Sequence, residues 1–175
     1  TYFGAVDLLN GPERERLLRE LPRHRAALPP YLDGTLVSDG MPLVLDWGDY
    51  LKLFDNVREE TAIGEASVSY IRLPSAAAAI RSTVPDARII FVLRDPADRL
   101  MSVLSGNLGR GSGPTFRAQL LPAADPQGRR TALVDGGRYA THLERWLGLF
   151  PRDQVRIYLY EDFRADARAV MRGIF

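Results

Sequence analysis

The feature that most restricts the fold is an apolar run that ends abruptly in charged residues, RIIFVLRDPADRLMS at residues 88–102. Its first six residues include β-branched and aromatic side chains without polar alternation, which is typical of a strand buried on both faces of a parallel sheet. Asp95 and Pro96 then supply a helix cap and a first helical residue. The stretch therefore predicts a central strand, a tight turn and a helix over about residues 97–104.

The rest of the chain alternates helical and strand patterns around this unit. Apolar residues at helical spacing, or runs of strong helix formers, predict helices at residues 12–21, 46–54, 75–83, 116–121, 139–150 and from 164 onward. Short apolar runs predict a brief strand near Ile63 and another at residues 154–163, whereas the prolines of 21–34 predict irregular structure. Strands that alternate with helices across long connections predict a single α/β domain with a parallel sheet.

Charge and composition limit which side chains can bind an anion. The formal net charge is +1, so no overall field favours nucleic acid or an anionic membrane as a partner. Lys52 is the only lysine, which leaves arginine to bind anions, and the absence of cysteine excludes disulfides and thiolate chemistry. No apolar run approaches the roughly 20 residues that span a bilayer. We expect a soluble, cytoplasmic and, from its arginine- and alanine-rich composition, bacterial chain.

The end of the central strand is the expected ligand site, because ligands of open α/β sheets collect where strands end and helices begin. Arg94 stands at that end, and Arg99 and Ser102 follow at a spacing that puts them on one side of the helix. An arginine fork, a helix start and a hydroxyl suit a dianionic phosphate. The alternative is that the arginines pair with Asp95 and Asp98.

This stretch resembles the 3′-phosphate-binding element of sulfotransferases that use 3′-phosphoadenosine 5′-phosphosulfate (PAPS), especially the bacterial and heparan-sulfate-type branch. The R-D-P-x-x-R-x-x-S pattern of that family is complete at residues 94–102. Further segments resemble the family in the same order, and they are GEASVSY (64–70), GGRYATHLERWLGLFP (136–151) and VRIYLYEDFRAD (155–166).

The resemblance implies a P-loop-kinase-like parallel sheet flanked by helices, and an enzyme that moves a sulfuryl group from PAPS to a hydroxyl or amine. The acceptor would be a carbohydrate or small metabolite, and no metal would be needed. Arg94 and Ser102 would hold the 3′-phosphate, and Arg99 would be a structural or secondary contact. The product nucleotide, adenosine 3′,5′-bisphosphate (PAP), keeps this 3′-phosphate. Glu65 resembles the general base of the heparan-sulfate-type enzymes, although it could instead cap the following helix.

The chain departs from the family pattern at several points. Val68 replaces a usual proline, and Ala66 stands where the heparan-sulfate enzymes often have lysine. The glycine-rich 5′-phosphosulfate loop with its lysine is not visible and is expected upstream of Thr1, and the C-terminal nucleotide-binding loop is expected beyond Phe175. We therefore interpret residues 1–175 as one partial sulfotransferase-like domain.

Two other functions remain open at this stage. The chain could be a truncated or degenerate relative that only binds the 3′-phosphorylated nucleotide, or another P-loop nucleotide-binding protein such as a nucleotide kinase. Four further features are not assigned a catalytic role. His142 is expected to be structural, His24 has no assigned role, the glycine-rich segment 106–114 is expected to be a flexible connection, and Glu161 and Asp162 are expected to hold a loop by hydrogen bonds.

Overall fold

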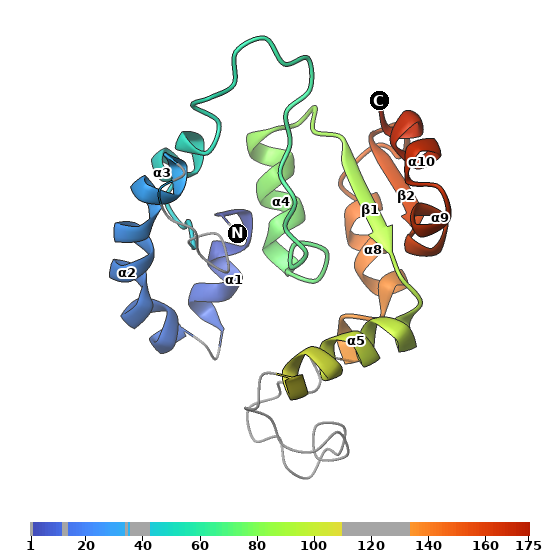
Figure 1. Cartoon of the computed structure of the whole chain (residues 1–175), viewed down its shortest axis with the longest axis horizontal. Helices are drawn as coiled ribbons and strands as arrows, with labels where there is room; N and C mark the ends of the chain where they lie inside the picture. Colours follow the sequence, from blue (N-terminus) through green and yellow to red (C-terminus); the bar gives the residue numbers. More distant parts are fainter. Residues whose placement is uncertain (1, 12–13, 34, 36–42, 110–133) are drawn as a thin grey trace. The chain divides into compact units, whose positions relative to one another are not determined.

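The computed structural model describes residues 2–11, 14–33, 35, 43–109 and 134–175 (Figure 1). These residues form two compact units, Thr1–Thr83 and Val84–Phe175. The interpretation of residues 1–175 as one domain stays a prediction. None of the described helices is both long and apolar enough to cross a membrane.

The first unit is helical. Its elements are a 3-10 turn η1 (Tyr2–Gly4) and the helices α1 (Ala5–Asn10), α2 (Arg14–Leu32), α3 (Trp47–Lys52) and α4 (Pro74–Thr83). Asp46 caps α3 as expected, because its Oδ1 accepts a hydrogen bond from the Asp49 N–H at 3.1 Å. Tyr50 of α3 is buried, and its ring centroid lies 5.3 Å from that of Phe3. Tyr50 therefore belongs to the core of this unit, whereas Trp47 at the start of α3 is exposed.

The start of α4 is capped from a distant part of the sequence. Asp7 of α1 accepts hydrogen bonds through Oδ2 from both the Ser75 N–H and the Ser75 hydroxyl, each at 2.8 Å. Ala76 and Ala77 are fully buried, and a Cβ placed on Gly4 would collide with the Leu73 side chain. Small residues therefore let η1 and α4 pack closely, and the helix predicted at 75–83 is confirmed.

Two predictions in this unit are wrong. Helix α2 continues through Pro22, Pro29 and Pro30, where the prolines predicted irregular structure. A proline inside a helix costs about 3 kcal/mol, but the burial of Leu28 favours the helix, and Pro29 still accepts the Asp33 N–H at 3.1 Å. The strand expected near Ile63 is also missing from the described residues, because Ile63 is exposed and its run has no buried face.

The second unit is built on a parallel pair of strands, β1 (Ile89–Leu93) and β2 (Val155–Leu159). The crossover between them includes α5 (Pro96–Gly109) and α8 (Tyr139–Leu147), and β2 is preceded by the 3-10 turn η3 (Arg152–Gln154). The chain ends with α9 (Tyr160–Ala165) and α10 (Ala167–Ile174), at the red end of the ribbon (Figure 1). The predicted α/β architecture with a parallel sheet is confirmed.

One face of the sheet is well packed and the other is not. Phe91 of β1 meets Trp146 of α8 edge to face with ring centroids 5.3 Å apart, and Trp146 is almost fully buried. On the opposite face, Ile90 and Val92 are 43% and 47% exposed. Helix α10 reaches that face at Tyr158, whose hydroxyl donates to the Gly173 carbonyl at 3.0 Å. The prediction of burial on both faces is therefore wrong for the described part of the chain, because no helix there covers Ile90 and Val92.

The helix after β1 is longer than its local signal suggested. It begins at Pro96 as predicted but extends to Gly109, beyond the expected end at residue 104. The predicted helix at 116–121 and most of the glycine-rich segment 106–114 lie outside the described residues.

Candidate functional site

The turn between β1 and α5 has the predicted cap. Asp95 accepts hydrogen bonds through Oδ1 from the N–H groups of Ala97 and Asp98, both at 2.9 Å. Its own carbonyl accepts the Arg99 N–H at 2.8 Å. Because the Asp95 carboxylate already occupies these first N–H groups of the helix, binding of an anion at this turn depends chiefly on side chains.

Arg94 is the first residue after β1, and its guanidinium is only loosely engaged. Its Nη2 lies 3.7 Å from Asp98 Oδ2, with the two side chains 34% and 65% exposed. An ion pair this exposed contributes about 0–1 kcal/mol. Within the described residues, the buried Arg94 Nε has no hydrogen-bond partner. Arg94 therefore pairs with Asp98, as the alternative predicted. This pairing leaves the Nε–H donor of the guanidinium without a partner among the described residues.

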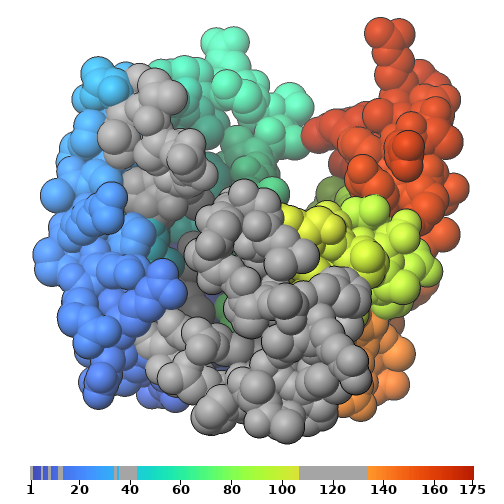
Figure 2. Space-filling view, turned by 60° about the horizontal axis from the view of Figure 1, so that its bottom comes forward, coloured from blue at the N-terminus to red at the C-terminus, as the bar shows by residue number. Residues whose placement is uncertain are grey.

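Arg99 and Ser102 both lie on α5, three residues apart and on one side of the helix, as expected. Ser102 is exposed, and part of α5, yellow in the space-filling view, reaches the surface (Figure 2). Arg99 is partly buried, and a Cβ placed on Gly137 would lie 3.6 Å from its Nη2. The structure thus brings Arg94, Arg99 and Ser102 into one strand–turn–helix segment, and their roles stay predictions.

The end of β2 supports this turn from the neighbouring strand. Glu161, in the first turn of α9, accepts a hydrogen bond through Oε1 from the Asp95 N–H at 3.1 Å. The predicted structural role of Glu161 is confirmed by this contact. For Asp162 the described hydrogen bond is made by its backbone carbonyl, which accepts the Asp166 N–H at 2.9 Å.

Tyr160 is a contact of the site that sequence reasoning missed. The Arg94 Cζ lies 5.3 Å from the centroid of the Tyr160 ring. The register of the sheet is the signal that could have revealed it. Leu93 pairs with Leu159 in parallel strands, so the next residues on the two chains, Arg94 and Tyr160, are neighbours.

Glu65, the candidate base, lies in the first unit between α3 and α4. It borders a hollow together with Tyr31 and Phe54, among other residues. The alternative that Glu65 caps the following helix is wrong, because α4 starts nine residues later and takes its cap from Asp7. Glu65 is exposed as a residue, but burial of its carboxyl group raises its pKa, against the opposing effect of a hydrogen bond with Tyr70.

The raised pKa of Glu65 predicts a pH dependence. As the predicted general base, Glu65 would have to be ionised, so kcat/KM is expected to fall as the pH drops through the pKa of Glu65, and this fall should lie above pH 4.5, the ordinary value for glutamate. The measurement is a pH profile of kcat/KM for the full-length protein. Glu59→Gln, a change at a nearby exposed carboxylate, should keep the same acid limb. A profile that stays flat down to pH 4.5 would contradict this prediction.

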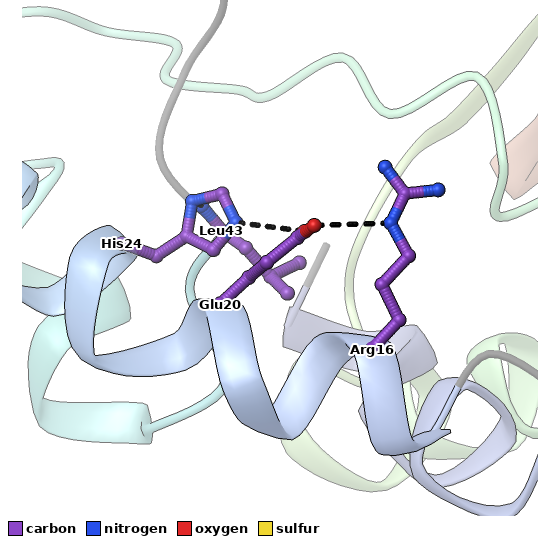
Figure 3. Close-up of polar contacts among 4 residues, drawn as sticks. All are labelled: Arg16, Glu20, His24 and Leu43. Carbon is purple, nitrogen blue, oxygen red and sulfur yellow. Dashed lines mark hydrogen bonds and ion pairs between the residues drawn. The ribbon is translucent and has the colours of Figure 1, made fainter.

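The two histidines have structural surroundings. His142 of α8 is 3% exposed, and its Nε2 lies 2.8 Å from the Asp135 carbonyl, as the structural interpretation predicted. His24 of α2 accepts the Leu43 N–H through Nδ1 at 3.1 Å, and its Nε2 lies 3.9 Å from Glu20 Oε2 (Figure 3). His24 thus ties the chain at Leu43 to α2. The described residues contain no group of three metal-ligating side chains.

The second unit is an α/β fold with an arginine at the carboxyl end of a parallel strand, which agrees with the P-loop-like fold expected from the sequence. The chain belongs to the sulfotransferase family, since the model of that family matches residues 14–175.

Individual relatives agree with this assignment. The chain is 30% identical over 137 residues to the human bifunctional heparan sulfate N-deacetylase/N-sulfotransferase 3, a match that covers 73% of this chain and 16% of that protein. It is 34% identical over 89 residues to the mouse heparan sulfate glucosamine 3-O-sulfotransferase 6, covering 50% and 26%. A sulfotransferase crystal structure from Alicyclobacillus acidocaldarius matches with 34% identity and a TM-score of 0.67, covering 74% of this chain and 54% of that one. The chain thus spans about a sixth of the length of the bifunctional relatives and about half of the solved one.

Proposed function

We propose that this chain is part of a sulfotransferase that moves a sulfuryl group from PAPS to a hydroxyl or amine of a carbohydrate or small metabolite. The observation that carries the proposal is the position of Arg94. Its guanidinium lies at the carboxyl end of β1, and its buried Nε has no hydrogen-bond partner among the described residues. Family membership supports the reaction class, and the names of the relatives support a carbohydrate acceptor.

The residues of the β1–α5 segment fit a nucleotide that carries a 3′-phosphate. Arg94 would donate hydrogen bonds to that phosphate, and Ser102 would donate through its hydroxyl from the exposed side of α5. Arg99 would contribute positive charge from a partly buried position. PAPS, when bound, supplies a sulfuryl group activated by its phosphate leaving group.

Glu65 would act on the acceptor. Its carboxylate would take the proton from the attacking hydroxyl or amine, and the raised pKa makes it a stronger base than an ordinary glutamate. Tyr70 is well placed to orient this carboxylate, because the Tyr70 hydroxyl hydrogen bonds with Glu65 and accepts the Phe3 N–H at 3.4 Å. A cytoplasmic location is also part of the proposal and rests on composition.

The test is an assay of label transfer from radioactive PAPS by the full-length protein, with N-deacetylated heparan, glucosamine and simple alcohols and amines as acceptors. We expect acceptor-dependent incorporation of label without added metal. Binding of the nucleotide without transfer to any acceptor would instead favour a relative that only binds. Phosphoryl transfer from ATP would favour a kinase, and either result would contradict the proposal.

A further inference from the structure

We propose that Tyr160 is a positioning residue, whose ring holds the Arg94 guanidinium in the orientation that receives the 3′-phosphate. This inference rests on the proposed function. It starts from the sheet register, which makes Arg94 and Tyr160 neighbours just beyond the last strand pair, Leu93 with Leu159. The guanidinium carbon lies 5.3 Å from the ring centroid, within the range of a cation–π contact.

The contact orients the arginine without using its donors. A guanidinium binds an aromatic ring through its flat face, whereas its N–H groups lie in the plane and point outward from its edge. The loose ion pair with Asp98 at 3.7 Å engages one of those groups only weakly. The cation–π contact with Tyr160 therefore reduces the freedom of a long side chain without engaging its N–H donors, which stay able to donate to a phosphate.

The residues that follow Arg94 and Tyr160 are also in contact, and their contact holds the backbone of the turn. Glu161 accepts the Asp95 N–H at 3.1 Å, so the residue after Tyr160 holds the residue after Arg94. The residues after β2 thus act on the turn at two points. Glu161 holds the backbone after Arg94, and Tyr160 holds the Arg94 side chain. Because a carboxylate at Glu161 contacts the backbone and not the guanidinium in the described contacts, it does not compete with a phosphate for the arginine.

The first experiment compares Tyr160→Leu with Tyr160→Phe by calorimetry on the full-length protein. The ligands are adenosine 3′,5′-bisphosphate and adenosine 5′-monophosphate, which lacks the 3′-phosphate. We expect Tyr160→Leu to weaken bisphosphate binding about two- to fivefold and to leave monophosphate binding unchanged, while Tyr160→Phe keeps both affinities. Equal loss for the two ligands, or the same loss in Tyr160→Phe, would overturn the inference.

A double-mutant cycle tests whether Tyr160 acts through Arg94. In an Arg94→Ala background the further change Tyr160→Leu should have no effect on bisphosphate affinity. If Tyr160→Leu still weakened binding in that background by the full factor, Tyr160 would act by another route.

A second readout does not need the nucleotide and so separates failure of the inference from failure of the proposed function. The Arg94 Nε–H signal in the NMR spectrum, assigned by its loss in Arg94→Ala, should carry a ring-current shift from Tyr160. That shift should disappear in Tyr160→Leu and persist in Tyr160→Phe. A signal that does not move in Tyr160→Leu would overturn the contact itself, whereas a normal shift with no bisphosphate binding would contradict the proposed function alone.

Discussion

Replacing Glu65 with glutamine is expected to slow turnover by about 10²–10⁴-fold, which is the usual contribution of a general base. Glutamine keeps the shape of the side chain but cannot accept the proton of the acceptor. The side chain belongs to the segment between α3 and α4 and not to the β1–α5 turn, so the affinity for adenosine 3′,5′-bisphosphate should stay within about twofold of the wild type. The measurements are kcat with saturating PAPS and the Kd of the bisphosphate.

The matched control is Glu59→Gln, which removes a nearby exposed carboxylate from the same stretch of chain. It should leave turnover unchanged. Full turnover in Glu65→Gln would mean that another group takes the proton. His142 is a poor substitute, because it is buried and its Nε2 is held at the Asp135 carbonyl. Loss of both turnover and thermal stability would point to a structural role for Glu65.

Replacing Arg94 with alanine is expected to weaken binding of adenosine 3′,5′-bisphosphate by about 1.5–3 kcal/mol, or roughly 10- to 150-fold. The reason is the loss of the charge-assisted hydrogen bonds that Arg94 is proposed to donate to the 3′-phosphate. Stability should change little, because the ion pair that Arg94 makes with Asp98 is long and exposed. Calorimetry gives the affinity, and the midpoint of thermal unfolding gives the stability.

Arg88→Ala is the control for charge. Arg88 is an exposed arginine that precedes the opposite end of β1, so its removal lowers the net charge equally without touching the turn. It should bind the bisphosphate as the wild type does. Equal weakening in both variants would mean that general electrostatic attraction, and not a site at Arg94, accounts for the affinity.

The parts of the fold that sequence reasoning predicted are those with strong local signals. The strand at β1, the cap at Asp95 and the helix after it follow from neighbouring residues alone, and so does the amphipathic helix α8. Helix α2 was missed because local propensity counts only the three prolines against it and does not contain tertiary burial such as that of Leu28.

The site residues that the sequence revealed are likewise those that lie close together along the chain. Arg94, Arg99 and Ser102 were found because a single motif holds them within nine residues. Tyr160 was missed because it meets Arg94 only through strand pairing 66 residues further along the chain. The cap of α4 by Asp7 was also beyond sequence reasoning, since Asp7 and Ser75 are 68 residues apart. That cap is what removes the alternative that Glu65 caps α4.

The most direct test of the account is a calorimetric titration of the full-length protein with adenosine 3′,5′-bisphosphate and, in parallel, with ADP. We expect the protein to bind the bisphosphate selectively, because the β1–α5 turn is proposed to recognise the 3′-phosphate that ADP lacks. Equal binding of the two nucleotides, or binding of neither, would contradict it.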